Sequence, residues 1–484
     1  MENKTRFNKY EDAVSYILSI PRFSGKSTIE ETKSFGEYLM TRVSEVTGSI
    51  NIHIAGTNGK GSVCAYLTAL NRNLAKSVGT FTSPHLSDIR ERICLNGEMI
   101  SKEEFLGAAN FIIEALEEYK ASGEDILDVS DSADIAPATG NATELPADFA
   151  DLTRTDPNVR PDYHPSFFEF MFFMARIYFA NNRPDVVIWE TGLGGRLDAT
   201  NTLPAKDVTV ITEIGLDHME YLGDTKEKIA SEKAGILMEG IPVVYARRDE
   251  GTAEVIEKRA RELNCPIYPI IAPIFERIEG SVRLFNKGIA FSYESRYYNN
   301  VTFEIGTQAV YQVENACVAL KVMELISDRS ELTPGIMQKG LLDMKWPGRM
   351  EEVEPGVYLD GAHNVDGIIS FVKSVAGDGC RGKRLLLFSA VMDKQVEEMA
   401  QIINDSGLFS MVASAHIDNS RGLAAESLKK ILNIFPDLFI GDSIYEAYRE
   451  LLGAKTDEDI LYVCGSLYLI GELNDAIRNG VAND

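Results

Sequence analysis

Short runs of β-branched and other apolar residues alternate with longer stretches of helical periodicity along most of the chain. In residues 50–54 apolar and polar side chains alternate as in a strand, and residues 62–74 then have the spacing of a helix. We expect further strands at 185–189, 207–212 and 241–245 and further helices at 224–238, 252–263 and 311–326. Strands separated by helices are typical of a buried parallel sheet, so the pattern predicts an α/β fold.

The alternation restarts after a Pro-Gly pair at residues 347–348, and this pair breaks both helix and strand. The next strands are expected at 357–359, 384–388, 411–414 and 460–464, with helices between them. We therefore predict a domain boundary near 346, which divides the chain into a larger domain at 1–345 and a smaller α/β domain at 346–484.

One segment of the larger domain, residues 122–160, departs from the alternation. It carries nine acidic and two basic residues, three prolines and many small residues, with little sustained periodicity. Such a segment has few apolar residues to bury against a core, so we predict a mobile surface insertion.

A glycine-rich loop follows the first predicted strand and leads into the first predicted helix of the alternation. Glycines allow the backbone to curl so that several N–H groups point at one anion, and a helix N-terminus adds positive partial charge. Lys60 would reach terminal phosphates, and Ser62 could donate a hydrogen bond or ligate magnesium. The spacing is not the strict GxxxxGK[ST] pattern, and the alternative is a flexible turn with a solvated lysine. The predicted nucleotide-binding residues of this loop are Gly56, Thr57, Asn58, Gly59, Lys60, Gly61 and Ser62.

Two further clusters follow predicted strands. Glu190 ends the strand at 185–189 and precedes a Gly-Leu-Gly-Gly turn; a carboxylate at the carboxyl end of a strand suits magnesium, although it could equally cap a helix or form an ion pair. His218 comes shortly after the strand at 207–212 and is one of six histidines, although a lone histidine is usually structural. The fold expected from these patterns is α/β: a P-loop ATPase-type domain with a mostly parallel sheet, plus a smaller Rossmann-like C-terminal α/β domain.

The amino-acid composition of the chain limits which classes of binding partner we expect. The chain has 484 residues, with 73 acidic and 48 basic side chains and a formal net charge of −25, so we expect no general binding to nucleic acid or to anionic membranes. No apolar run approaches the ~20 residues of a membrane span, and the first ten residues are too polar for a secretory signal. Six scattered cysteines without a CxxC pair predict reduced thiols and a cytoplasmic location.

The motifs, taken in order, resemble the folylpolyglutamate synthase/dihydrofolate synthase family, a branch of the ATP-dependent Mur ligase superfamily. In the larger domain they are AGTNGKGS at 55–62, TSPHL at 82–86, ERI at 91–93, ETGLGGRLDATN at 190–201, GLDH at 215–218, YLG at 221–223, EKAGI at 232–236 and YQVENA at 311–316. They continue with WPGRME at 346–351, LDGAHN at 359–364 and GSLYL at 465–469. The resemblance covers nearly the whole chain, and the acidic insertion departs from the usual pattern.

This resemblance implies an amide-forming ligase. ATP would phosphorylate a carboxylate of folate or dihydropteroate to an acyl phosphate, and the amino group of L-glutamate would displace the phosphate. Because both partners of the first step are anionic, cations must screen their repulsion, which explains the need for Lys60 and magnesium. The family also implies two magnesium ions and a monomer.

Family roles can be carried over to matching positions. Lys60, Glu190, His218 and Lys233 would be catalytic; Ser83 and Glu190 would ligate one magnesium and His218 a second. Lys233 resembles the carbamylated lysine of the family, with an ordinary helix lysine as the alternative. Further nucleotide contacts would be Asn315, Arg349, Asp360 and His363, and the substrate contacts would be Phe167, Phe168 and Glu169. The two phenylalanines could instead belong to a helix core.

Two other functions stay open from the residues. One is another Mur-type amide ligase that acts on a nucleotide-linked peptidoglycan precursor, although TSPHL and GLGGRLDATN look more like the folate branch. The other is a nucleotide-binding protein without ligase chemistry, which would have no need of Glu190, His218 and Lys233. The choice between dihydrofolate synthase, folylpolyglutamate synthase and both activities is not decided by these motifs.

Overall fold

The structure is a computed structural model, and the part of the chain that it describes is residues 6–21, 28–43, 48–122, 163–279, 287–392, 395–418 and 421–478. The predicted mobile insertion therefore lies outside the described residues, apart from Ser122 at the end of helix α4.

An eight-stranded sheet forms the centre of the larger domain, in the order β4-β3-β2-β5-β1-β6-β7-β8. Its six parallel strands are β1 (Ile50–Ala55), β2 (Val78–Phe81), β5 (Val186–Glu190), β6 (Val208–Ile211), β7 (Val243–Ala246) and β8 (Ile267–Ile270). Two short strands, β3 (Ile93–Leu95) and β4 (Glu98–Met99), pair antiparallel at one edge. The sheet is thus mostly parallel, as the alternation of strands and helices predicts.

Alternate residues of β5 face two different cores, which explains why every residue of the strand before Glu190 is apolar. Val187 and Trp189 belong to an aromatic-rich core under four helices, where Trp189 meets Phe172 and Phe179 edge to face at 5.5 and 5.4 Å between ring centroids. The helices of this first face are α1 (Tyr10–Ser19), α2 (Ile29–Thr41), α4 (Lys102–Ser122) and α6 (Phe167–Asn182). Val186 and Ile188 face the opposite core, built with α3 (Lys60–Asn73), α10 (Tyr311–Ile326) and α11 (Pro334–Asp343).

The far end of the sheet is covered by three helices and followed by a small second sheet. Helices α7 (Met219–Leu222), α8 (Lys226–Ala234) and α9 (Glu250–Glu262) are grouped with β6 and β7, and α8 and α9 each supply three buried apolar residues of that core. The second sheet is antiparallel, with strands β9 (Phe275–Glu279), β10 (Lys287–Tyr293) and β11 (Val301–Ile305) in the order β11-β10-β9. The alternation of strands and helices did not predict this sheet.

The C-terminal part forms a six-stranded sheet in the order β12-β13-β17-β14-β15-β16. Its strands are β12 (Arg349–Glu354), β13 (Val357–Asp360), β14 (Arg384–Phe388), β15 (Met411–Ala415), β16 (Leu438–Gly441) and β17 (Ile460–Cys464), all parallel except β12. The helices are α12 (Val365–Val375), α13 (Val396–Asp405), α14 (Ala425–Leu432), α15 (Ile444–Ala454) and α16 (Leu467–Arg478). Leu386 and Phe388 pack toward α12 and α13 while Leu385 and Leu387 pack toward α15 and α16, so helices cover both faces.

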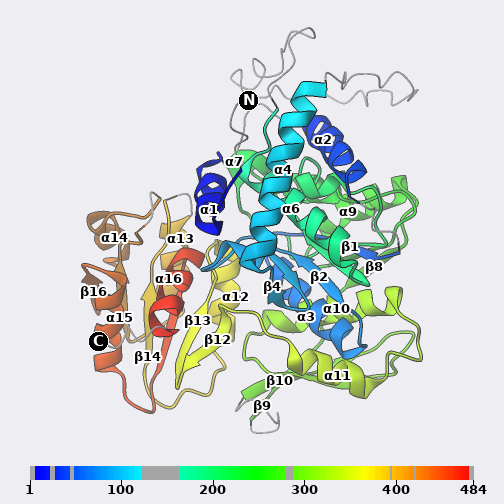
Figure 1. Cartoon of the computed structure of the whole chain (residues 1–484). Helices are drawn as coiled ribbons and strands as arrows, with labels where there is room; N and C mark the ends of the chain where they lie inside the picture. The colour runs from blue at the N-terminus through cyan, green and yellow to red at the C-terminus, as the bar shows by residue number, and fades with distance from the viewer. Residues whose placement is uncertain are drawn as a thin grey trace.

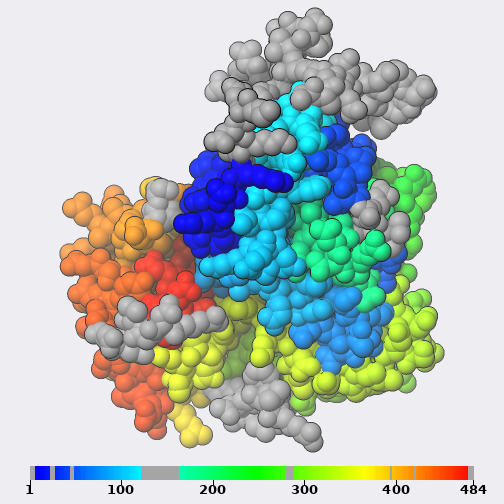
Figure 2. All heavy atoms as spheres, in the orientation of Figure 1, coloured from blue at the N-terminus to red at the C-terminus, as the bar shows by residue number. Residues whose placement is uncertain are grey.

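Figure 1 shows the yellow-to-red C-terminal unit beside the blue-to-green larger unit, and Figure 2 shows the two as adjoining lobes. Their contact involves the segment between them: the indole of Trp346 lies against Gly61 at the start of α3, and Gly348 lies against Ile470 and Leu86. The carboxyl ends of β1, β5 and β6 all lie at one edge of the eight-stranded sheet because these strands are parallel. Among the described helices, none is both long and apolar enough to span a membrane.

Candidate active site

The glycine-rich loop connects β1 to α3, as the sequence predicts for a phosphate-binding loop. Gly59 precedes the helix in the left-handed region, with φ of +89°, and a Cβ there would lie 2.5 Å from the Asn315 side-chain oxygen. Glycine is required at this position by both the backbone conformation and the close approach of α10.

The loop is also held from behind by the segment after β6. The backbone N–H groups of Thr57 and Asn58 donate to the carbonyl of Glu213, at 2.8 and 3.3 Å. The Thr57 hydroxyl donates to the carbonyl of Gly215 at 3.1 Å and accepts from its N–H at 3.0 Å. The phosphate loop and residues 213–215 therefore form one hydrogen-bonded unit.

Lys60 and Glu190 meet inside this unit. The Lys60 ammonium lies 3.9 Å from Glu190 Oε1 and donates to the carbonyls of Gly56 and Thr57, at 3.1 and 3.3 Å. Glu190 Oε2 accepts from the backbone N–H of Ser83 at 3.0 Å. Burial raises the pKa of the Glu190 carboxyl, and the Lys60 charge opposes this shift.

Lys233 reaches the same loop from α8. Its side chain is buried, and its Nζ donates to the Gly56 carbonyl at 2.8 Å. Burial, assisted by the charge of Lys60, lowers the pKa of Lys233 to about 7. Two lysines, a carboxylate and the carbonyl of Gly56 are thus gathered where the sequence predicts catalysis.

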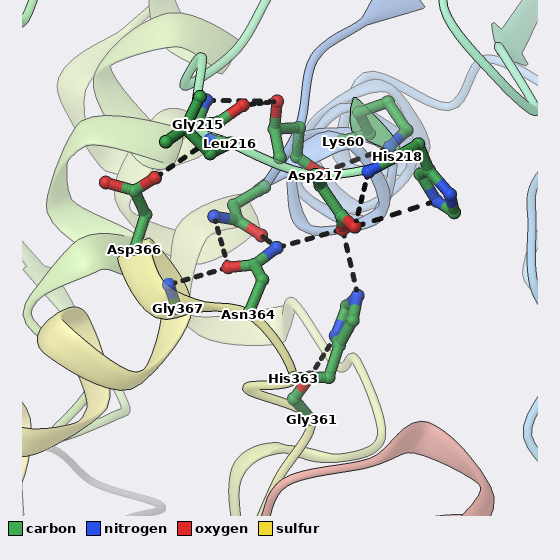
Figure 3. A network of polar contacts seen from close by, with 12 residues as sticks. Lys60, Gly215, Leu216, Asp217, His218, Gly361, His363, Asn364, Asp366 and Gly367 are labelled. Atoms are coloured by element: carbon green, nitrogen blue, oxygen red, sulfur yellow. Dashed lines mark hydrogen bonds and ion pairs between the residues drawn. The ribbon is translucent and has the colours of Figure 1, made fainter. Parts of the chain in front are cut away.

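Asp217 connects the two domains at this site, although the sequence analysis gave it no role. Figure 3 shows the carboxylate between three side chains. Its Oδ2 accepts from the Asn364 amide at 3.1 Å and lies 3.7 Å from His363 Nε2. Its Oδ1 accepts from the backbone N–H of His218 at 2.9 Å and lies 4.0 Å from His218 Nε2. Both predicted histidines therefore lie close to one carboxylate.

His218 and His363 differ in environment. His218 precedes α7 with a left-handed φ of +51°, and its side chain is 44% exposed. His363 comes from the loop after β13, and its Nδ1 lies 2.7 Å from the carbonyl of Gly361. Because a carbonyl only accepts, Nδ1 of His363 carries the proton and Nε2 is directed toward the site.

Asp360 lies where the C-terminal sheet meets helix α10 of the larger domain. It is the last residue of β13, is buried, and accepts from the Tyr311 hydroxyl at 2.5 Å and from the backbone N–H groups of Met350 and Ala362 at 3.0 and 2.9 Å. Burial raises the pKa of its carboxyl. Arg349, the first residue of β12, donates to the Gly348 carbonyl at 2.9 Å.

Helix α10 closes the other side of the phosphate loop. Gln312 donates from Nε2 to the buried hydroxyl of Ser62 at 3.0 Å and accepts from the Asn315 amide at 3.0 Å. Gln312, which the sequence analysis did not single out, thereby links two predicted nucleotide contacts. The signal for it was its place in the YQVENA motif.

The predicted substrate residues lie on the first turn of α6. Phe167 is buried, with the Arg92 guanidinium 5.0 Å above its ring, and Glu169 forms a capping box with Ser166 and accepts from Thr32 at 2.6 Å. Phe168 lies against Gly192, where a Cβ would be 2.6 Å from the ring. Phe168 is thus the member of this set that lies beside the loop after Glu190.

A buried carboxylate that the sequence analysis did not single out shapes that loop. Asp198 accepts from the backbone N–H groups of Gly192 and Leu193, both at 2.8 Å, and from the N–H and hydroxyl of Thr200 at 3.0 and 2.5 Å. The Thr200 hydroxyl also lies 2.7 Å from Nε2 of His53, a buried residue on β1. These hydrogen bonds fix the course of the chain after β5 and connect it to β1, the strand that precedes the phosphate loop.

Comparison with known proteins gives consistent relatives. The dihydrofolate synthase/folylpolyglutamate synthase of Bacillus subtilis is 31% identical over 98% of this chain and 100% of its own length. The solved structure of folylpolyglutamate synthase from Thermotoga maritima is 27% identical, covers 97% of each chain and superposes with a TM-score of 0.72. A solved FPGS–AMPPCP complex is 25% identical, covers 97% of this chain and 100% of that one, and has a TM-score of 0.75. A search against protein-family models found no match.

Proposed function

Since the chain belongs to the folylpolyglutamate synthase/dihydrofolate synthase family, we propose that it is an ATP-dependent ligase that adds L-glutamate to folates, to dihydropteroate, or to both. The observation that carries the proposal is that Lys60 and Lys233 both donate to the carbonyl of Gly56, while Glu190 lies 3.9 Å from the Lys60 ammonium. A protein that merely bound nucleotide would have no use for a second buried lysine and a buried carboxylate at this point.

The first chemical step joins two anions, the carboxylate of the folate and the terminal phosphate of ATP. Lys60 is held among carbonyl oxygens and near Glu190, so its charge is oriented before the nucleotide arrives. In the proposed mechanism the ammonium turns to the transferring phosphoryl group and stabilises the charge that develops there. The resulting acyl phosphate is then attacked by the amino group of L-glutamate, and phosphate leaves.

Magnesium fits this site by the chemistry of its donors. Glu190 is a buried carboxylate at a strand end, and its Oε2 lies 3.0 Å from the backbone nitrogen of Ser83, so both residues belong to one corner of the site. We propose Ser83 and Glu190 as ligands of one ion and His218 as a ligand of a second, with phosphate oxygens completing the coordination. Magnesium in this position would neutralise charge on the transferring phosphoryl group.

Lys233 is proposed to be carbamylated. An ordinary lysine, with a pKa near 10.5, is almost entirely protonated at neutral pH, whereas burial gives Lys233 a pKa of about 7. A large fraction of its amine is then neutral and can attack carbon dioxide, with loss of a proton, to give an anionic carbamate. The carbamate would replace a buried positive charge by an oxygen ligand beside the Gly56 carbonyl.

Nucleotide and substrate contacts are proposed from both domains. The loop residues Gly56 to Ser62 would cradle the phosphates, while Asn315, Arg349, Asp360 and His363 would complete the nucleotide site. Phe168, beside Gly192, is the best-placed aromatic ring for the pterin. We propose that the two functional domains divide at residues 345/346, three residues before β12 begins at Arg349. A cytoplasmic monomer remains our proposal from composition and family.

Phosphate release measures this function directly. The purified protein, with ATP, magnesium and L-glutamate, should release phosphate only when a pterin substrate is added, and dihydropteroate and tetrahydrofolate should be assayed separately. Activity with both would establish a bifunctional enzyme. Release that ignores glutamate and both pterins, or that requires a nucleotide-linked peptidoglycan precursor, would replace the proposal by one of its alternatives.

A further inference from the structure

The C-terminal domain contacts the phosphate loop through two asparagines. Asn364 Nδ2 donates to Asn58 Oδ1 at 3.0 Å, and Asn58 Nδ2 donates to Asn364 Oδ1 at 3.3 Å. The two residues are 306 positions apart in sequence and come from different sheets. A reciprocal pair of this kind needs a donor and an acceptor on each side chain, which only an amide supplies at this length.

Both polar atoms of the Asn364 amide form further hydrogen bonds. Besides Asn58, its Nδ2 donates to the carboxylate of Asp217 at 3.1 Å, and its Oδ1 accepts from the Gly367 N–H at 2.8 Å as the N-cap of α12. The side chain is buried. Its oxygen therefore caps α12 and accepts from Asn58, while its nitrogen joins the phosphate loop to the segment after β6 (Figure 3).

A second contact lies two residues further along the chain. Asp366, in the first turn of α12, accepts from the backbone N–H of Leu216 at 3.1 Å and pairs with Lys226 at 2.9 Å. A Cβ on Gly215 would lie 2.5 Å from the Asp366 carboxylate, so residues 215–217 and helix α12 are in close contact. The start of α12 thus docks on the same 215–217 segment that already holds the phosphate loop through Thr57.

We propose that Asn364 and Asp217 are positioning residues that couple the C-terminal domain to the phosphate loop, so that nucleotide binding and the placing of His363 depend on each other. The inference rests on the proposed function for its catalytic consequence, but its thermodynamic part concerns nucleotide alone. Binding that orders Asn58 favours the contact with Asn364, and by reciprocity the contact favours binding. His363 is the residue before Asn364, so the same contact holds its imidazole against Asp217.

Two substitutions at 364 separate the interdomain contact from the helix cap. Asn364→Asp and Asn364→Ser both keep an oxygen that caps α12, since Asp and Ser are good N-caps. Aspartate removes the donor and adds a carboxylate opposite Asp217, whereas serine is neutral and too short to reach Asn58. Each should weaken AMPPCP binding, measured by calorimetry, about 10-fold, as expected for loss of a hydrogen bond to a charged group.

The rescue variant exchanges the two groups. In Asp217→Asn/Asn364→Asp the amide at position 217 can donate to the carboxylate at position 364, and that carboxylate can still accept from Asn58 Nδ2. Of the three contacts only the donor to Asn58 Oδ1 stays lost. Affinity for AMPPCP should return to within about threefold of the parent. Asn433→Asp, an exposed position in the same domain, makes the same chemical change away from the contact and should leave affinity unchanged. Melting temperatures of all variants should agree within a few degrees, which excludes general unfolding.

The inference is wrong if Asn364→Ser binds AMPPCP like the parent, because the effect of aspartate would then be simple charge repulsion. It is also wrong if the exchanged pair stays as weak as Asn364→Asp. If the parent protein binds AMPPCP but releases no phosphate with any pterin, the proposed function fails, while these affinities still decide the inference.

Discussion

At the scale of single residues, the site depends on charged groups that are held by burial rather than exposed to solvent. Lys60 and Lys233 donate to one backbone carbonyl, and Glu190 lies beside Lys60. Burial raises the pKa of Glu190 and lowers that of Lys233, and the charge of Lys60 lowers the pKa of both. Such an arrangement is unfavourable for stability alone, because buried charges cost free energy unless they are compensated. Its presence beside a phosphate loop is what the transfer of a phosphoryl group requires.

Lys60→Ala should lower kcat by at least a hundredfold without unfolding the protein. The ammonium donates to the carbonyl oxygens of Gly56 and Thr57 and approaches Glu190, so its removal takes away charge at the phosphates while the apolar core is unaffected. The measurement is steady-state phosphate release together with thermal unfolding, with the exposed Lys258→Ala as control. A variant with near-parental kcat would show that Lys60 does not serve the transfer.

Carbamylation of Lys233 predicts a dependence on carbon dioxide and pH. After removal of dissolved carbon dioxide, activity should fall, and it should recover on re-addition at a rate that rises from pH 6 to pH 8 at constant carbon dioxide. The sign follows from the pKa of about 7, because the reactive neutral amine becomes the major form above that pH. Lys233→Arg should show neither loss nor recovery, and an unaffected parent would argue for an unmodified lysine.

The pKa of about 7 at Lys233 also predicts how the free energy of unfolding depends on pH. In the unfolded chain the lysine pKa returns to about 10.5, so between pH 7 and 10.5 the unfolded state binds more protons than the folded state. The unmodified folded protein should therefore gain stability as pH rises through this range, while below pH 7 the full penalty of the buried charge remains. Lys233→Met should flatten this part of the profile in chemical unfolding.

At the scale of elements, the loop after β5 depends on one buried carboxylate. Asp198→Ala would leave the N–H groups of Gly192, Leu193 and Thr200 without their acceptor, which should cost about 2–4 kcal/mol of unfolding free energy. Thr200→Val, which removes the hydroxyl shared by Asp198 and His53 but keeps the acceptor of the three backbone N–H groups, should cost less. Urea unfolding checks both, and an Asp198→Ala variant as stable as its parent would mean that the loop keeps its path without this acceptor.

The sequence predicts the bounds of a helix or strand well where a single apolar pattern runs through the whole segment. Tyr311–Ile326, Arg384–Phe388 and Ile460–Cys464 have the same bounds in the structure as the pattern indicates. The antiparallel sheet β9–β11 was not predicted, although Val301–Ile305 alternates apolar and polar residues, because the pattern within one strand does not determine which strands it pairs with. Edges of elements shift by one or two residues where caps such as Thr225 decide the start of a helix.

At the scale of the whole molecule, the site is completed by residues that no local pattern connects. Glu190 and Lys60 follow strands and were recognised from their motifs, whereas Asp217 meets Asn364 across 147 positions and two sheets. Sequence reasoning identified His218 and His363 beside these two residues but had no means of pairing them. That contact depends on how the domains dock, which is set by the packing of Trp346 on Gly61 and of α12 on the 215–217 segment.

In the proposed reaction ATP activates the substrate carboxylate as an acyl phosphate before glutamate attacks. The most direct measurement uses dihydropteroate or tetrahydrofolate substrate, as the phosphate-release assay selects, with ¹⁸O in the reacting carboxylate. We expect one ¹⁸O atom to pass into each phosphate released, because the carboxylate oxygen that attacks ATP leaves with the phosphoryl group. Phosphate that carries no label, while the glutamylated product forms, would contradict it.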